Sequence, residues 1–208
     1  MAAQASGRSG VAVVLSSAAL LSVRCGGIID QYRTVYRFNR AVTAGYEAHV
    51  GTRTTHEVVH TSGGIESPAA RFARNNTLHA YGVTFDDFGR TYGEWKALRR
   101  KNWLLAPRQF VEECAVHIRT RCSSGLLLLW MLTSLGVRPT VFGLPYTSSN
   151  TTDCIQYKYT DTGCTMRNHT EHAFAREHTQ IKRWVRDGTI ANGSLVCQFG
   201  RHGSQYQR

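Results

Sequence analysis

Three stretches of this 208-residue sequence carry residue types that suit chemistry at a bound anion. His172 lies at the start of an expected helix, where the helix dipole opposes protonation and leaves the imidazole able to accept a proton near neutral pH. Ser123, Ser124 and Gly125 stand directly before an apolar run, and free N–H groups at a helix start favour a phosphate. Asn39 follows an expected strand, at the edge where open α/β sheets hold nucleotides. Together they predict a general base beside a nucleotide.

Each stretch also has an ordinary structural explanation. A histidine at a helix start, a serine N-cap on a core helix and an asparagine that caps a turn are all common without any ligand. The functional hypothesis therefore depends on the order and conjunction of the stretches, and no single residue carries it.

The surrounding sequence predicts an α/β domain. Residues 35–38 and 140–142 predict short buried strands, and the apolar run after Gly125, about 11 residues long, predicts a buried helix that is too short to span a membrane. Residues 11–15 predict a first strand, followed by a turn of small residues and a helix. The run from 11 to 23 also has the pattern of a signal-peptide core, which is the alternative interpretation.

Composition limits the partners. Lys and Arg number 25 against 14 Asp and Glu, a net charge of +11, so the surface attracts anions. The charges are scattered and no RNA-binding signature accompanies them, so we expect no nucleic acid and favour an anionic sugar nucleotide. There is no D-x-D, and the nine histidines are not spaced as metal ligands, so we expect no metal.

Three motifs resemble those of the eukaryotic sialyltransferases, in the same order. The string R-F-N-x-A-x-T-x-G-Y-E-x-x-V-G-T-R-T-T at 37–55 is similar to the large sialylmotif, and residues 11–18 resemble its opening. The S-S-G, apolar helix, strand and L-P pattern at 123–145 is similar to the small sialylmotif. His172 and Glu177 match the H-x-x-x-x-E of the very small motif. The wording looks closest to the N-acetylgalactosaminide α2,6-sialyltransferases.

The resemblance implies a Rossmann-like (GT-A-like) glycosyltransferase sandwich, with a central, mostly parallel sheet flanked by helices. It implies inverting transfer of sialic acid from CMP-sialic acid to a glycoprotein or glycolipid hydroxyl, with His172 as general base, Glu177 in a supporting role and no cofactor besides the donor. The donor-binding residues it implies are Ser16, Asn39, Ser123, Ser124, Gly125 and Tyr157. The location it implies is the Golgi lumen. The family's membrane anchor is missing from this sequence, so we expect a fragment or a start inside the domain.

The sequence also departs from the family pattern. The cysteines that join the large and small motifs are replaced by Val11 and by Leu135 or Gly136, which suggests a substituted contact. Ala18 stands where a glycine is expected, and the aromatic motif lacks its usual histidine. A catalytically impaired member of the family is therefore one alternative, and a small secreted basic glycoprotein with a binding role is another.

Cysteines and sequons fit a secretory lumen. Cys154 and Cys164, ten positions apart around turn residues, predict a local disulfide, whereas the pairing of Cys25, Cys114, Cys122 and Cys197 stays open. N-x-[ST] sequons begin at Asn75, Asn150, Asn168 and Asn192. We expect a disordered N-terminal remnant over 1–10, a single catalytic domain over 11–200 and a tail over 201–208.

Overall fold

One parallel sheet forms the centre of the protein. The computed structural model describes residues 8–38, 41–58, 79–81, 108–144 and 173–199. Within these residues six strands pair in the order β4-β3-β2-β1-β5-β6, and every pair is parallel. The strands are β1 (Arg8–Val14), β2 (Tyr32–Phe38), β3 (His56–Val58), β4 (His79–Tyr81), β5 (Thr140–Phe142) and β6 (Ala191–Asn192). The predicted α/β class is confirmed.

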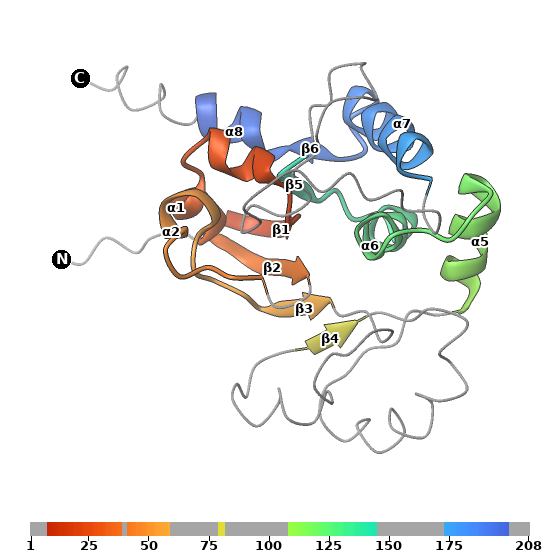
Figure 1. Ribbon diagram of the computed structural model, residues 1–208, viewed down its shortest axis with the longest axis horizontal. Helices are drawn as coiled ribbons and strands as arrows, with labels where there is room; N and C mark the ends of the chain where they lie inside the picture. The colour runs from red at the N-terminus through yellow and green to blue at the C-terminus, as the bar shows by residue number, and fades with distance from the viewer. Residues whose placement is uncertain (1–7, 39–40, 59–78, 82–107, 145–172, 200–208) are drawn as a thin grey trace.

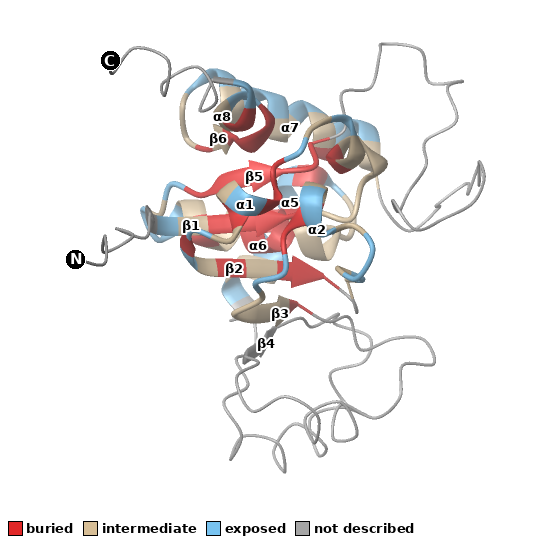
Figure 2. Cartoon of the chain, turned by 90° about the vertical axis from the view of Figure 1, so that its left-hand side faces the viewer, coloured by how far each residue is buried: buried red, intermediate tan, exposed pale blue. Residues whose placement is uncertain are grey.

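Helices cover both faces of this sheet (Figure 1). On one face lie η1 (Ala18–Ser22), α1 (Gly26–Ile29), α2 (Glu47–Val50) and α8 (Gly193–Phe199). The other face carries α5 (Arg108–Ile118), α6 (Ser124–Ser134) and α7 (Phe174–Arg186). Figure 2 shows the buried residues concentrated in the strands and in the helix surfaces that face them.

The alternation of side chains along β1 creates two separate cores. Ala12 and Val14 pack among residues of the α1–α8 face, whereas Val13 packs with α5 and α6. All three are at most 2% exposed, because β1 is central and covered on both sides. The sequence V-A-V-V therefore has no polar position, as expected for a parallel strand buried on both faces.

α6 is the most apolar helix of the described part. Leu126, Leu127, Leu128, Leu129 and Leu132 are all buried. Its leucines face the sheet on one side and the neighbouring helices on the other, so the helix has no polar stripe. Among the described helices, none combines the length and hydrophobicity that a membrane crossing requires.

Two glycines let α1 and α2 pack against each other. A Cβ on Gly26 would lie 1.8 Å from the carbonyl oxygen of Glu47, and a Cβ on Gly51 would lie 2.8 Å from the carbonyl oxygen of Gly26. Gly51 also has a φ of 71°, which disfavours other residues. The V-G pair of the large motif therefore serves backbone packing.

Element bounds differ from the sequence predictions mainly at the termini. β1 begins at Arg8, inside the segment 1–10 that the sequence led us to expect to be disordered. The expected helix after the small-residue turn is instead a short 3₁₀ turn, η1, followed by the four-residue α1. β4, β6 and α8 were not predicted, because strands of two or three residues and a seven-residue helix carry too little periodicity to detect.

Two disulfides lie within the described residues. Cys25 bonds to Cys197 across 172 positions of sequence, and Cys114 bonds to Cys122 across eight. These pairs use the four cysteines whose pairing the sequence left open. Neither joins the motif positions Val11 and Leu135 or Gly136. Val11 packs against the core, and Leu135 is 63% exposed.

Candidate functional site

The sheet topology fixes where a ligand can enter. β1 lies between β2 and β5, so the chain leaves β1 toward one side of the sheet and later returns to the other. In open α/β sheets, ligands bind outside the carboxyl ends of the strands at this kind of switch point. Here those ends are Leu15, after β1, and Gly143, after β5. The N–H of Leu15 donates to the Phe142 carbonyl oxygen at 3.0 Å, which holds the two ends together.

The start of α6 lies at this switch point. A Cβ on Gly125 would be 3.4 Å from Leu15 Cδ2, so the first turn of α6 lies directly against the end of β1. Among the described residues, the N–H groups of Ser124 and Gly125 and the Ser124 hydroxyl have no hydrogen-bond partner. Free N–H groups at the positive end of a helix dipole attract a phosphate or carboxylate. The first turn of α6 therefore offers the free N–H groups that the predicted phosphate site requires.

Ser123 has a different role from the one predicted. Its N–H donates to Glu177 Oε1 at 2.8 Å and its hydroxyl donates to Glu177 Oε2 at 2.5 Å, while its Oγ accepts from the N–H of Leu126 at 3.3 Å. All of these groups are already paired within the protein. Ser123 thus caps α6 and holds Glu177, and the neighbouring Ser124 and Gly125 are the residues left to face a ligand.

Glu177 connects α6 to α7. It lies in the first turn of α7 and is only 2% exposed. A buried carboxylate is costly without hydrogen-bond donors, and Ser123 supplies two. Arg176, one residue earlier, donates from Nη1 to the Ile118 carbonyl oxygen at 3.1 Å. The start of α7 is therefore fixed against the start of α6 and the end of α5.

α7 begins slightly later in the sequence than predicted. The helix begins at Phe174 with Ala173 as its N-cap, so His172 precedes the helix and does not belong to its first turn. His172 itself lies outside the described residues. The described chain resumes at Ala173, one residue beyond it, and Glu177 ties that helix to the switch point.

Ser16 and Ser17 follow the carboxyl end of β1 and precede η1. Ser17 is occupied locally, because its Oγ accepts from the N–H of Ala19 at 3.1 Å and caps η1. Ser16 is partly buried, and its hydroxyl has no partner within the described part of the chain. Ser16 therefore follows the end of β1, and the Ser124–Gly125 turn lies against the same strand end through Leu15.

Several predicted residues lie outside the described ranges, and their predictions stay as they were. These are the proposed base His172, the donor-binding residues Asn39 and Tyr157, the disulfide pair Cys154 and Cys164, and the sequon asparagines Asn75, Asn150 and Asn168.

The fourth sequon has a surrounding that disfavours a glycan. Asn192 is 8% exposed, and its Oδ1 accepts from the N–H of Ser194 at 3.0 Å. A Cβ on the next residue, Gly193, would lie 2.4 Å from the Phe142 ring, so the backbone is pressed against β5. A glycan on Asn192 has no room in the folded domain, and we no longer expect one there.

The large motif contributes bracing residues that the sequence did not identify. The Asp30 carboxylate accepts from the N–H groups of Thr52 and Arg53 at 2.8–3.0 Å, and Thr55 Oγ1 accepts from the N–H of Val35 at 2.7 Å. Arg37, 1% exposed, donates to the carbonyl oxygens of Val50 and Arg53. The sequence signal for this bracing network is an acid just before a strand, followed by a threonine-rich loop.

Two perturbed groups lie on the α5–α7 side of the sheet. Burial, and secondarily the charge of Lys182, lowers the pKa of His178 below its ordinary value. Burial raises the pKa of Tyr36 above its ordinary value. Tyr36 is thus an uncharged phenol at neutral pH, and His178 an uncharged imidazole. In the part of the chain that the structure describes, no group of three or more His, Cys, Asp or Glu side chains could hold a metal ion.

The first part of the chain matches a known protein family and several of its members. The family model for glycosyltransferase family 29 (sialyltransferase) matches residues 4–86. The chicken β-galactoside α-2,6-sialyltransferase 2 is 44% identical over 50 residues, which is 24% of this chain and 10% of that protein. The human CMP-N-acetylneuraminate-β-galactosamide-α-2,3-sialyltransferase 1 is 49% identical over 49 residues, 24% of this chain and 14% of that protein. The matched segments thus span about a tenth of these relatives.

Structural comparison extends over most of the chain. A mammalian sialyltransferase, solved in complex with Gal-β-1-3GalNAc-ortho-nitrophenol, superposes with a TM-score of 0.62 at 18% identity, over 89% of this chain and 68% of that one. The sialyltransferase CstII from Campylobacter jejuni, in complex with CMP-3FNeuAc, gives a TM-score of 0.54 at 11% identity, over 91% and 84% of the two chains. At these identities the likeness concerns the fold.

Proposed function

Because this chain belongs to the sialyltransferases of glycosyltransferase family 29, we propose that it transfers sialic acid from CMP-sialic acid to a hydroxyl group of a glycan. One observation carries the proposal. The Glu177–Ser123 hydrogen bonds fix the start of α7 against the start of α6, beside two N–H groups that have no partner among the described residues.

The donor phosphate would lie on the first turn of α6. Ser124 and Gly125 offer backbone N–H groups, and the absence of a side chain on Gly125 leaves the backbone approachable. Ser16 would offer a hydroxyl from the loop that follows β1. These groups would stabilise negative charge on CMP as it departs, in place of a metal ion. Asn39 and Tyr157 complete the proposed donor site as sequence predictions.

His172 would act as the general base. The acceptor oxygen attacks the anomeric carbon of sialic acid, the bond from that carbon to the CMP phosphate oxygen breaks, and the hydroxyl proton moves to the imidazole. A single displacement of this kind inverts the anomeric configuration. Glu177 contributes by position, since its carboxylate is already paired with Ser123 and is buried.

An α2,6 linkage to N-acetylgalactosamine follows from the motif wording, whereas the matched relatives include both α2,6 and α2,3 enzymes. We propose the Golgi lumen as the location, with a glycoprotein or glycolipid as acceptor. A family member that binds CMP without turnover is the second candidate, favoured by the replaced motif cysteines at Val11 and Leu135 or Gly136.

The test combines donor binding with turnover. CMP should raise the thermal midpoint of the folded chain, because a ligand that binds only the native state stabilises it. His172→Ala should lower transfer by about 10²–10⁴-fold, the usual contribution of a general base, with CMP stabilisation retained. His117→Ala, an exposed histidine on α5, is the matched control and should leave transfer unchanged.

Three results separate the possibilities. If folded parent protein gains no stability from CMP, the donor site is wrongly assigned. If CMP stabilises the parent but no transfer occurs, the impaired alternative holds. If His172→Ala transfers at the parent rate, another group is the base.

A further inference from the structure

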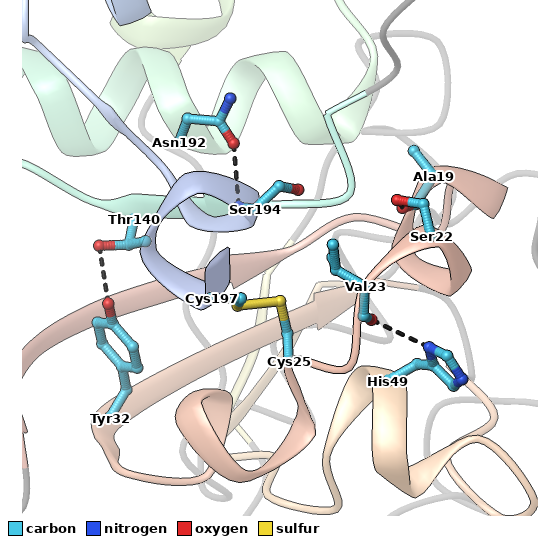
Figure 3. The surroundings of a disulfide bond; sticks show 10 residues. All are labelled: Ala19, Ser22, Val23, Cys25, Tyr32, His49, Thr140, Asn192, Ser194 and Cys197. Carbon is cyan, nitrogen blue, oxygen red and sulfur yellow. Dashed lines mark hydrogen bonds between the residues drawn. A yellow bond between two sulfur atoms is a disulfide. The ribbon is translucent and has the colours of Figure 1, made fainter. Parts of the chain in front are cut away.

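The Cys25–Cys197 disulfide joins the start of α1 to α8 on one face of the sheet (Figure 3). Cys25 is the N-cap of α1, which leads into β2, and Cys197 belongs to α8, which packs on β5. Both cysteines are at most 2% exposed. The bond therefore connects elements on opposite sides of β1, on the face of the sheet opposite α6.

The segment 16–25 is held by the β5-to-α8 part at each of its ends and in its middle. At its start, the N–H of Leu15 donates to Phe142. In its middle, Leu20 lies so close to Gly143 that a Cβ there would be 2.8 Å from Leu20 Cγ. At its end, Cys25 is bonded to Cys197, and this is the covalent contact among them.

A second link crosses β1 on the same face. The Tyr32 hydroxyl donates to Thr140 Oγ1 at 3.1 Å, between β2 and β5, and the Tyr32 ring lies over Gly10 of β1. The ring also meets Phe142 edge-on, with centroids 5.8 Å apart. A polar bond and a covalent bond thus fasten the same two parts of the domain, on the same side of the sheet.

His49 supports the segment from its other side. His49 Nδ1 lies 3.0 Å from the Val23 carbonyl oxygen, so Nδ1 donates to it. This contact belongs to α2 and not to the β5-to-α8 part, so it orients Val23 without closing the switch point. Cys25–Cys197 and Tyr32–Thr140 therefore add a covalent and a polar side-chain link to the backbone pairing of β1 with β2 and β5.

We propose that Cys25 and Cys197 are positioning residues for donor binding: their disulfide holds segment 16–25 against the β5-to-α8 part, and so sets where Ser16 lies relative to the first turn of α6. This inference rests on the proposed function, because the ligand is the CMP moiety of the donor. Without the bond, segment 16–25 keeps its local cap at Ser17 but loses its covalent attachment, and Ser16 is no longer held at a fixed separation from α6.

The experiment measures CMP affinity in the full chain, produced in an oxidising compartment, with and without the bond. Cys25→Ala/Cys197→Ala is compared with Leu132→Ala, a buried residue in the last turns of α6 that lies about 12 Å along the helix from Ser124. The two variants are compared at a temperature at which both are fully folded. Substitution is preferred to reduction, because a reductant would also act on Cys114–Cys122.

We expect the double cysteine variant to bind CMP about tenfold more weakly than the parent, a usual size for coupling through a packed network, and Leu132→Ala to bind like the parent. An unchanged CMP affinity in the folded double variant overturns the inference and leaves the bond a stabilising element alone. If the parent itself does not bind CMP, the proposed function fails first and this inference falls with it.

If the double variant does not fold, Tyr32→Phe decides. This substitution keeps the ring packed and removes only the hydroxyl that reaches Thr140. We expect CMP affinity to fall about threefold in it, with kcat changed less than the donor KM, in line with the weaker of the two links. An unchanged donor KM in Tyr32→Phe overturns the inference.

Discussion

Glu177→Gln tests the contact that organises the candidate site. The substitution keeps the size of the side chain but replaces one carboxylate oxygen with an NH₂ group. The Ser123 N–H can still donate to the remaining oxygen, whereas the Ser123 hydroxyl then meets a donor instead of an acceptor. The hydroxyl can turn to accept from the new NH₂ group. It already accepts from the N–H of Leu126, and its own proton is then left without an acceptor.

The expected cost follows from burial and charge. A hydrogen bond to a charged group contributes about 1.5–3 kcal/mol, and Glu177 is almost completely shielded from water, so little of this is recovered from solvent. We expect Glu177→Gln to lower the free energy of unfolding by about 2 kcal/mol. Glu113→Gln is the matched control, because Glu113 is exposed and its bond within the described residues runs along its own helix to Gln109. This change should cost less than about 0.5 kcal/mol.

Urea denaturation of a double-mutant cycle provides the measurement. Ser123→Ala removes the same bond from the other side and also the cap of α6, so by itself it should cost about 2 kcal/mol. Because the two residues share a bond, the double variant should be more stable than the sum of the single changes predicts by about 1 kcal/mol or more. Strict additivity, or a Glu177→Gln effect no larger than that of Glu113→Gln, refutes the assignment of Glu177 as the link between α6 and α7.

Two further predictions concern the fold around the site. Gly26→Ala should lower the free energy of unfolding by about 3 kcal/mol or prevent folding, because the added Cβ would meet the Glu47 carbonyl oxygen. Gly27→Ala is the control: its Cβ meets nothing within 4 Å, so the change should be neutral or slightly stabilising. Thermal unfolding of the two variants checks this, and equal midpoints would contradict it. His178 has a lowered pKa in the folded state, so the unfolded chain binds more protons and stability should be present above about pH 6.5 and lost as pH falls through the folded pKa. His178→Gln should flatten this loss in urea titrations below about pH 6.5, and a parent-like slope in the variant would contradict it.

The sequence by itself determined the α/β class and most of the central elements. Residues 11–14 and 35–38 are β-branched or apolar at nearly every position, the pattern of a strand buried on both faces. The leucine run of α6, with a serine before it, predicts both a core helix and its N-cap, and the cap is observed on Leu126. The local chemistry at these positions agrees with the tertiary structure, so a local pattern was sufficient.

The tertiary structure alone decided how the candidate site is divided. Ser123 and Ser124 are the same residue type at adjacent positions. Contact with Glu177, 54 residues away in sequence, commits Ser123 to bracing, whereas Ser124 has no side-chain partner among the described residues. The Cys25–Cys197 pairing was likewise undetermined, since disulfide connectivity depends on which elements meet across β1. Long-range contacts of this kind are set by the strand order, and strand order leaves no trace in the spacing of neighbouring residues.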